Sequence, residues 1–137
     1  MRVEVDIRKL IDEALKVLPN SYAPYSNTHV AVAILTANGK IFLGVNVENA
    51  SYSLTICAER VAVASAITHG EKNFVAVAIV SDTPEPLPPC GACRQVLAEF
   101  TDSNLLIVSY SIKSGKTIKW RLGELLPYTF NSNYIKY

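Results

Sequence analysis

The chain has 137 residues, half of them hydrophobic, which is enough for one domain with a substantial core and too short for two ordinary domains. Thirteen Lys and Arg stand against twelve Asp and Glu, a formal net charge of +1 with no long run of either sign, which argues against the concentrated basic face of a nucleic-acid binder. The apolar runs are too short to span a membrane and no apolar signal core follows Met1, so we expect one cytoplasmic domain, residues 1–137, with no nucleic-acid or membrane partner.

The first predicted element is an amphipathic helix. Apolar residues recur at intervals of three and four over residues 7–18, and Pro19-Asn20 ends the pattern.

Two strands are expected next, over residues 29–37 and 40–47, where residues are β-branched or alternate in polarity. Asn38-Gly39 between them is a strong hairpin signal, so these two strands should be antiparallel.

The second half of the chain alternates between predicted helices and strands. An Ala-rich helix is expected over residues 57–69, a strand covered on both faces over 74–80, and a helix starting near residue 90. Two further strands are expected over residues 105–110 and 117–122. This order of elements favours a five-stranded mixed sheet with helices on its faces, an α/β fold.

Three cysteines are the main chemical signal in the sequence. Cys90 and Cys93 form a C-x-x-C pair, and Cys57 begins the preceding helix. A catalytic zinc site has three protein ligands and an open position, which fits three cysteines with none left over. The alternative is a redox pair plus one buried thiol. His69 lies too far along its helix to be a fourth ligand, whereas His29 stays possible or is simply packed or exposed.

Glu59 and Arg60 lie close to Cys57 in the sequence. A carboxylate beside zinc can move the proton of an activated water, so Glu59 is the candidate general acid and base. Cys57 and Glu59 point to nearly opposite sides of a regular helix, so both can face one metal only if Cys57 lies at the non-helical entry. Arg60 either balances the charge of the thiolates or is an ordinary exposed arginine.

The run Cys57-Ala58-Glu59-Arg60, with the run 89–95 (Pro-Cys-Gly-Ala-Cys-Arg-Gln), resembles the zinc-dependent cytidine deaminase family. The segments 22–26, 46–50 and 124–127 are similar to counterparts in the short homotetrameric class of that family. The resemblance implies a three-layer α/β/α cytidine deaminase-like fold and one zinc ion per chain, held by the three cysteines. It also implies a reaction: hydroxide activated by zinc attacks C4 of cytidine or deoxycytidine, Glu59 shuttles the protons, and uridine or deoxyuridine and ammonia leave, a task in pyrimidine salvage.

The resemblance also assigns binding residues for this small-molecule nucleoside. It implies that Asn46 and Glu48 hold the ribose hydroxyls and that the Ala58 backbone contacts the base. Because Asn46 and Glu48 alternate with apolar residues, they share one face of a strand, which is otherwise typical of a polar edge facing solvent. The resemblance also matches Phe130 to a C-terminal aromatic that reaches a neighbour's pocket in the family's homotetramer, and Tyr52 to a residue near the subunit junction. Both are equally compatible with ordinary core aromatics.

Three positions depart from the family pattern. Thr28 stands where a phenylalanine usually lines the base pocket, Ala31-Val32 replaces Gly-Ala, and Pro88 replaces a common Ser. A reshaped pocket leaves open a related substrate such as blasticidin S, although the Asn46 and Glu48 pair favours ribose. Two further functions compete with these: a nucleic-acid cytosine editor, which the near-neutral charge disfavours, and a noncatalytic zinc-stabilised module.

Overall fold

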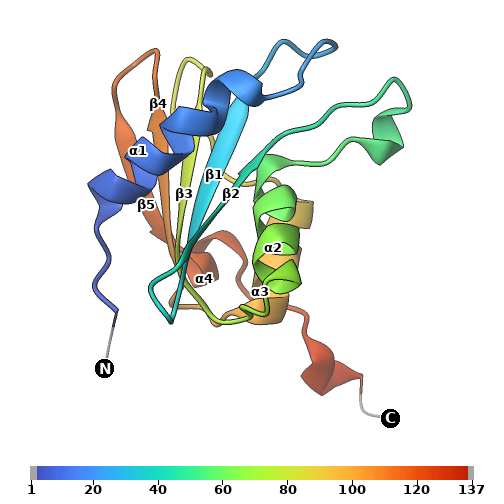
Figure 1. The fold of residues 1–137 in the computed structure, drawn as a ribbon. Coiled ribbons are helices and arrows are strands. Elements are labelled where there is room, and N and C mark those ends of the chain that lie inside the picture. Colours follow the sequence, from blue (N-terminus) through green and yellow to red (C-terminus); the bar gives the residue numbers. More distant parts are fainter. Residues whose placement is uncertain (1–2, 136–137) are drawn as a thin grey trace.

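The computed structural model describes residues 3–135 and contains one five-stranded mixed sheet of order β2-β1-β3-β4-β5 (Figure 1). Only β3 and β4 run parallel, and the other neighbouring pairs are antiparallel. The strands are β1 (Val30–Thr36), β2 (Ile41–Val45), β3 (Phe74–Ser81), β4 (Leu106–Ser111) and β5 (Thr117–Arg121). The predicted mixed sheet of five strands is therefore confirmed.

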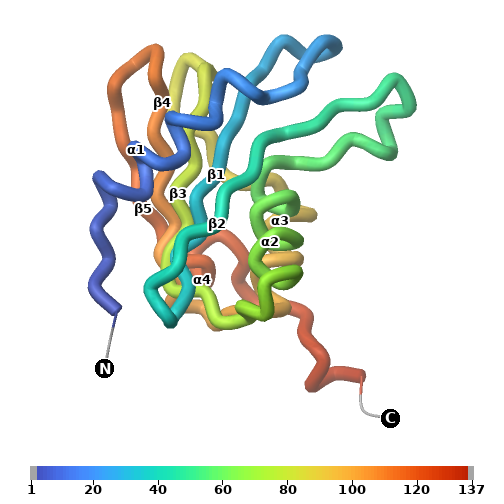
Figure 2. The backbone as a smooth tube through the Cα atoms, in the orientation of Figure 1, coloured from blue at the N-terminus to red at the C-terminus, as the bar shows by residue number. Residues whose placement is uncertain are grey.

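Helices cover both faces of the sheet and make three layers, as expected. One helix packs on one face, two helices pack on the other, and a short fourth helix follows β5 (Figures 1 and 2). The helix on the first face is α1 (Ile7–Val17), and the two helices on the opposite face are α2 (Ala58–Thr68) and α3 (Gly91–Phe100). The short helix after β5 is α4 (Leu122–Leu125).

The core divides between the two faces because successive strand residues point to opposite sides. In β1 every residue is buried: Ala31 and Ala33 pack under α1, and Val32 and Ile34 pack under α2. Strand β3 is almost continuously buried as well, which confirms the prediction that it is covered on both faces. The edge strand β5 is mostly exposed, and its Lys and Arg residues lie at the solvated rim.

The close approach of α2 to the sheet depends on Gly44 in β2. A Cβ atom at this position would lie 2.4 Å from the Ala62 nitrogen and 2.5 Å from the Ala58 carbonyl oxygen. Such distances are shorter than any van der Waals contact, so only glycine lets the first turn of α2 lie against β2. The side chains that begin α2 are placed by this contact.

Two predicted strands end earlier than expected. The strand predicted over residues 40–47 ends at Val45, and Asn46 instead turns its side chain into hydrogen bonds with residues 21–30. The strand predicted over 117–122 ends at Arg121, because Leu122 begins α4 and is buried under the sheet. Within residues 3–135, every helix is too short or too polar to cross a membrane.

Candidate active site

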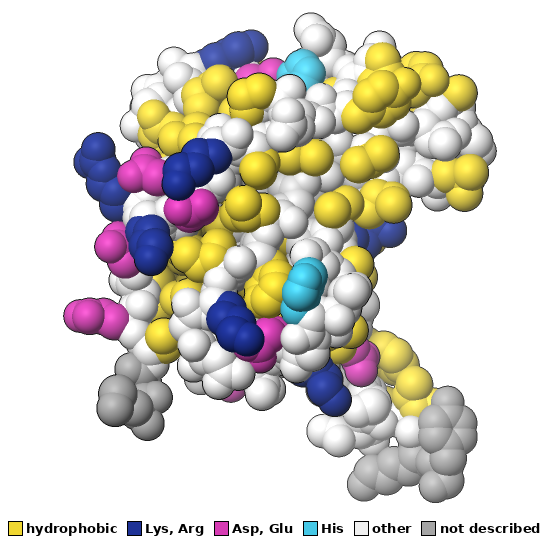
Figure 3. Space-filling model, in the orientation of Figure 1, with side chains coloured by type: hydrophobic (Ala, Val, Ile, Leu, Met, Phe, Trp, Pro, Cys, Tyr) yellow, Lys and Arg dark blue, Asp and Glu magenta, His cyan; other side chains and the backbone are white. Residues whose placement is uncertain are grey.

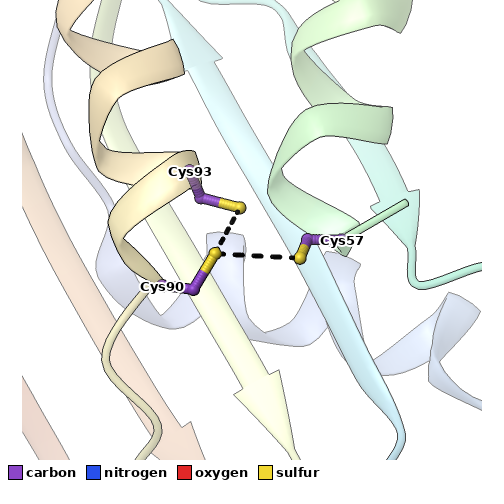
Figure 4. A group of neighbouring side chains, drawn as sticks. All are labelled: Cys57, Cys90 and Cys93. Carbon is purple, nitrogen blue, oxygen red and sulfur yellow. Dashed lines mark hydrogen bonds between the residues drawn. The ribbon is translucent and has the colours of Figure 1, made fainter. Parts of the chain in front are cut away.

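Cys57 and Cys90 occupy equivalent positions at the starts of α2 and α3. Each is the N-cap residue of its helix, with extended backbone angles (φ −69°, ψ 151° and φ −66°, ψ 164°). Cys93 lies one turn into α3 and is fully buried. The non-helical entry expected of Cys57 is confirmed, and the two helix starts bring all three sulfurs together (Figure 4).

The distances between the sulfur atoms suit a single metal ion. Cys90 Sγ lies 3.9 Å from Cys57 Sγ and 3.4 Å from Cys93 Sγ, and all three atoms lie within 4.8 Å of one another. Three thiolates around zinc, with Zn–S bonds of about 2.3 Å at tetrahedral angles, would place sulfurs about 3.8 Å apart. All three cysteines are free rather than paired as a disulfide. The cluster fits zinc.

Positive charge surrounds the cluster. The starts of α2 and α3 direct the positive ends of their dipoles and their unpaired N–H groups toward the sulfurs. Hydrogen bonding from the Cys93 thiol and from the Arg60 guanidinium lowers the pKa of Cys57 to about 5, so that this sulfur is a thiolate at neutral pH. Arg60 also donates from Nη2 to the Thr55 carbonyl oxygen (3.1 Å), while its buried Nε has no oxygen or nitrogen partner among the described residues.

Glu59 is the second residue of α2 and only 5% exposed. Burial raises the pKa of its carboxyl group, and the neighbouring Cys57 thiolate raises it further. A buried carboxyl next to three metal-binding sulfurs lies where a proton carrier is needed. The structure thus brings together Glu59, Arg60 and the three cysteines.

Neither histidine belongs to the sulfur cluster. His29 Nδ1 contacts Asp82 Oδ2 at 2.7 Å, and its backbone N–H donates to Asp82 Oδ1 at 2.8 Å. His69 caps the far end of α2, where Nδ1 meets the Ser65 carbonyl oxygen. The metal-suited group in residues 3–135 consists of cysteines alone, so the possible fourth ligand His29 is instead an anchor between β1 and β3.

Asn46 is nearly buried and has most of its hydrogen-bonding capacity occupied. Its Oδ1 accepts from the Ser21 hydroxyl and from Val30 N–H (3.0 Å), and its Nδ2 donates to the Thr28 carbonyl oxygen (2.8 Å). An amide has two acceptor positions and two donor hydrogens, so one N–H has no partner among residues 3–135. Asn46 therefore fastens residues 21–30 to the end of β2.

Glu48 lines a hollow with the 25–26 loop and the short helix at residue 52. The hollow has a volume of about 340 Å³, and its lining residues are Tyr25, Ser26, Glu48, Tyr52 and Thr55. The Glu48 Oε1 atom accepts from Tyr25 N–H and Ser26 N–H, each at 3.0 Å, and Oε2 accepts from the Ser26 hydroxyl. The Ser26 hydroxyl, assisted by these N–H groups, lowers the pKa of Glu48.

The two aromatics expected near subunit junctions are exposed and are not core residues. Tyr52 is 73% exposed and packs edge-to-face on Tyr25, with ring centroids 6.0 Å apart. Phe130 is 56% exposed and stacks on Tyr134 in the C-terminal segment, which extends away from the sheet (Figure 2). The interpretation of the pair as ordinary core aromatics is wrong.

A comparison with known families decides the assignment of this site. The sequence model of a protein family described as the cytidine and deoxycytidylate deaminase zinc-binding region matches residues 5–109, which include all three cysteines and Glu59. The chain belongs to the cytidine and deoxycytidylate deaminase family. The match leaves out residues 1–4 and all residues after 109, which include the end of β4, β5, α4 and the C-terminal segment.

Individual members of the cytidine and deoxycytidylate deaminase family match nearly the whole chain. A cytidine deaminase of Sporosarcina psychrophila is 41% identical over 133 residues, 97% of each chain. The crystal structure of a cytidine deaminase from Burkholderia pseudomallei superposes with a TM-score of 0.87 at 43% identity, covering 92% of this chain and 100% of that one. A blasticidin-S deaminase of Bacillus cereus is 30% identical over 113 residues, 77% of this chain and 79% of that protein.

Sequence reasoning missed the residues that support the site. Ser21 and Ser26 bond to Asn46 and Glu48, and Arg94 donates to the Pro89 carbonyl oxygen just before Cys90 and to the Leu125 carbonyl oxygen in α4, both at 2.7 Å. Each of these contacts joins segments that are distant in sequence or lie in loops. The spacing of hydrophobic residues along the sequence does not predict such pairs.

Proposed function

We propose that this protein is a zinc-dependent cytidine deaminase that converts cytidine and deoxycytidine to uridine and deoxyuridine with release of ammonia. The observation that carries the proposal is the meeting of Cys57, Cys90 and Cys93 with the buried Glu59 at two helix starts. Three thiolates leave a position open at a tetrahedral metal, as catalytic zinc sites do. The reaction forms a bond between C4 of the base and the oxygen of water, and it breaks the bond between C4 and the exocyclic amine.

The three cysteines would hold the metal, and the residues around them would offset the negative charge of the three thiolates. Zinc bound there would supply Lewis acidity that lowers the pKa of its bound water to near neutral, so that water becomes a nucleophile near neutral pH. Arg60, beside Cys57 and Cys93, offsets the excess negative charge of three thiolates. The free N–H groups at the starts of α2 and α3 do the same.

Glu59 moves the protons of the reaction. Its carboxylate takes a proton from the attacking water, delivers it to the ring nitrogen next to C4, and passes another to the leaving amine, which departs as ammonia. Its place on the first turn of α2 holds the carboxylate beside the metal-binding sulfurs. The Ala58 backbone, which Gly44 places against β2, contacts the base.

Asn46 and Glu48 bind the sugar. Asn46 has one free amide hydrogen, and Glu48 has one free acceptor position on Oε2. A hydroxyl group both donates and accepts, so sugar hydroxyls suit both positions. Two side chains each already fixed by three hydrogen bonds lose little conformational entropy when they bind such a group.

A deaminase of blasticidin S and a noncatalytic zinc module are the competing functions. The cytidine deaminases of Sporosarcina psychrophila and Burkholderia pseudomallei are more similar to this chain than the blasticidin-S deaminase of Bacillus cereus is, at 41% and 43% against 30% identity. A noncatalytic module would have no use for a buried carboxyl beside its metal. Deamination of a free nucleoside explains Glu59, Asn46 and Glu48 together.

The proposed enzyme is a homotetramer. Large hydrophobic side chains are exposed on the projecting loops around residues 22 and 47–56, and hydrophobic groups gather there at the upper right of Figure 3. Such a concentration of exposed apolar surface is typical of protein interfaces. Tyr52 contributes to the hollow beside Glu48, and Phe130 lies on the extended C-terminal segment, from which it reaches a neighbour's pocket.

The proposed setting is pyrimidine salvage in the cytoplasm. The three thiolates must stay reduced to hold zinc, and reducing conditions are those of the cytoplasm. A free nucleoside rather than a nucleic acid suits the near-neutral chain, whose net charge is +1.

The test is loss of ultraviolet absorbance with cytidine, deoxycytidine, cytosine and blasticidin S, each measured with zinc-loaded protein, metal-stripped protein and a Glu59→Ala variant. We expect turnover of cytidine and deoxycytidine that requires both zinc and Glu59. Turnover of blasticidin S alone would show that the substrate is wrong. Zinc binding without turnover of any of the four compounds would favour the noncatalytic module.

A further inference from the structure

The carboxylate of Glu48 is held by three donors from a single short turn. Tyr25 N–H and Ser26 N–H both donate to Oε1 at 3.0 Å, and the Ser26 hydroxyl donates to Oε2. A carboxylate has about four acceptor positions, two on each oxygen. Oε1 is therefore filled, and the one remaining position is on the oxygen that the Ser26 hydroxyl contacts.

The direction of the Ser26 hydroxyl is fixed by a second bond. Thr28 N–H donates to Ser26 Oγ at 3.0 Å, so the hydroxyl accepts on one side and turns its own proton toward Glu48. Asn27 between them has a left-handed backbone (φ 55°), a conformation that Asn tolerates better than most residues, and its N–H closes the turn on the Ala23 carbonyl oxygen at 3.0 Å. The turn is shaped to aim its donors at one carboxylate.

We propose that Ser26 is a positioning residue for sugar recognition, which orients the Glu48 carboxylate so that the last acceptor position of Oε2 is presented to a nucleoside hydroxyl. This inference rests on the proposed function, in which Glu48 binds the sugar. The single proton of the Ser26 hydroxyl is donated to Glu48, and one of its two lone pairs accepts from Thr28 N–H, so Ser26 has no hydroxyl proton left to donate to a nucleoside. It therefore acts through Glu48.

The charge of Glu48 supports the same role. The hydrogen bond from the Ser26 hydroxyl is the largest influence that lowers the pKa of Glu48, so the carboxylate stays ionised well into the acid range. His29 is the other titratable group that acts on it, and His29 is itself paired with Asp82. An ionised carboxylate accepts a stronger hydrogen bond from a hydroxyl than a protonated one does.

The test compares cytidine with 2′,3′-dideoxycytidine, which lacks the 2′ and 3′ hydroxyls of the sugar, in the wild type, Ser26→Ala, Glu48→Gln and the double variant. We expect Ser26→Ala to raise KM for cytidine about tenfold and to leave kcat/KM for the dideoxy substrate within about twofold. The double variant should be no worse than Glu48→Gln alone, because both changes remove one interaction. Ser26→Thr keeps a hydroxyl and should restore most of the binding.

The matched control is Ser103→Ala, the same substitution at an exposed loop position between α3 and β4, which should leave both substrates unaffected. The pH profile gives a second readout. Removing the Ser26 hydroxyl moves the pKa of Glu48 up toward its ordinary value of 4.5, so the rise of KM on acidification should begin at a higher pH in Ser26→Ala. His29 and its partner Asp82 are present in both proteins, so the comparison isolates the Ser26 hydroxyl.

Equal losses for cytidine and the dideoxy substrate, or additive losses in the double variant, would overturn the role of Ser26. If Glu48→Gln leaves the preference between the two substrates unchanged while cytidine is still turned over, the sugar role of Glu48 is wrong and the inference falls with it. If the wild type turns over no nucleoside, the proposed function fails. The pKa of Glu48, measured by carbon-detected NMR in wild type and Ser26→Ala, then decides the link between the two residues, and equal values would overturn it.

Discussion

Glu59 offers the sharpest separation between holding zinc and using it. Its carboxyl lies beside the sulfur cluster, but the group of side chains suited to hold the metal consists of the three cysteines. We expect Glu59→Ala to keep one zinc ion per chain and the melting temperature within a few degrees, but to lower kcat by about 10²–10⁴-fold, because only the proton carrier is removed. The measurements are zinc content, thermal unfolding and the absorbance assay. Unchanged turnover in a zinc-loaded variant would contradict the role of Glu59.

Thr28 stands where the family resemblance implies a phenylalanine that lines the base pocket. Its peptide group is fixed on both sides, since its N–H donates to Ser26 and its carbonyl accepts from Asn46, so a substitution changes the side chain rather than the loop. We expect Thr28→Phe to lower KM for cytidine about fivefold, because an aromatic ring stacks on a base. Thr28→Val, which adds no ring, is the control. A higher KM in Thr28→Phe would count against a base-stacking role for this position.

Among the elements, α2 is held at a fixed height above the sheet by Gly44. A methyl group there would overlap the backbone of Ala58 and Ala62. We expect Gly44→Ala to lower the free energy of unfolding by about 1–3 kcal/mol, because overpacking forces the helix outward. Thermal and denaturant unfolding of the metal-free proteins measures this directly, without a contribution from zinc.

Gly91→Ala is the matched control for Gly44→Ala. Gly91 is the first residue of α3, and a Cβ atom there would meet nothing within 4 Å. The same substitution should therefore leave the stability of the metal-free protein unchanged within about 0.5 kcal/mol. Equal stability of both variants would mean that the contact of α2 with β2 does not constrain the helix.

The starts of α2 and α3 are supported by loops as much as by the sheet. Val47 bridges to Ile56, the residue before Cys57, through two hydrogen bonds of 2.9 Å, and Arg94 fixes the Pro89 carbonyl before Cys90. Both metal-binding N-caps are thus preceded by a residue whose backbone is held. Preorganised ligands of this kind favour one metal geometry.

The molecule exposes large aromatic side chains to solvent, which is typical of a surface that associates with another protein chain. We expect four chains of 15.0 kDa to associate to a species of about 60 kDa, measured by light scattering at micromolar concentration. Phe130→Ala should weaken the assembly and lower activity most at low protein concentration, since a partner's pocket then loses this ring. A monomer of full activity at all concentrations would contradict the proposed tetramer.

Much of the fold could be predicted because its signals are local. The helix at residues 7–17 follows from apolar spacing, the hairpin at residue 39 from Asn38-Gly39 with its positive φ of 82°, and β3 from a continuous apolar run. The ends of elements were harder to predict. The end of β2 at Val45 and the short helix α4 depend on the hydrogen bonds of Asn46 and on the burial of Leu122, which are tertiary contacts.

By itself, the sequence determined the chemistry at this site: three thiols with no leftover, a carboxylate two residues from one of them, and a polar pair at 46 and 48. Ligand type, ligand number and spacing are properties of the chain. Only the tertiary structure decided that His29 pairs with Asp82 instead of joining the cysteines, and that the Ser26 hydroxyl donates to Glu48. Those pairings join residues 53 and 22 positions apart, and such contacts exist only once the sheet has brought its loops together.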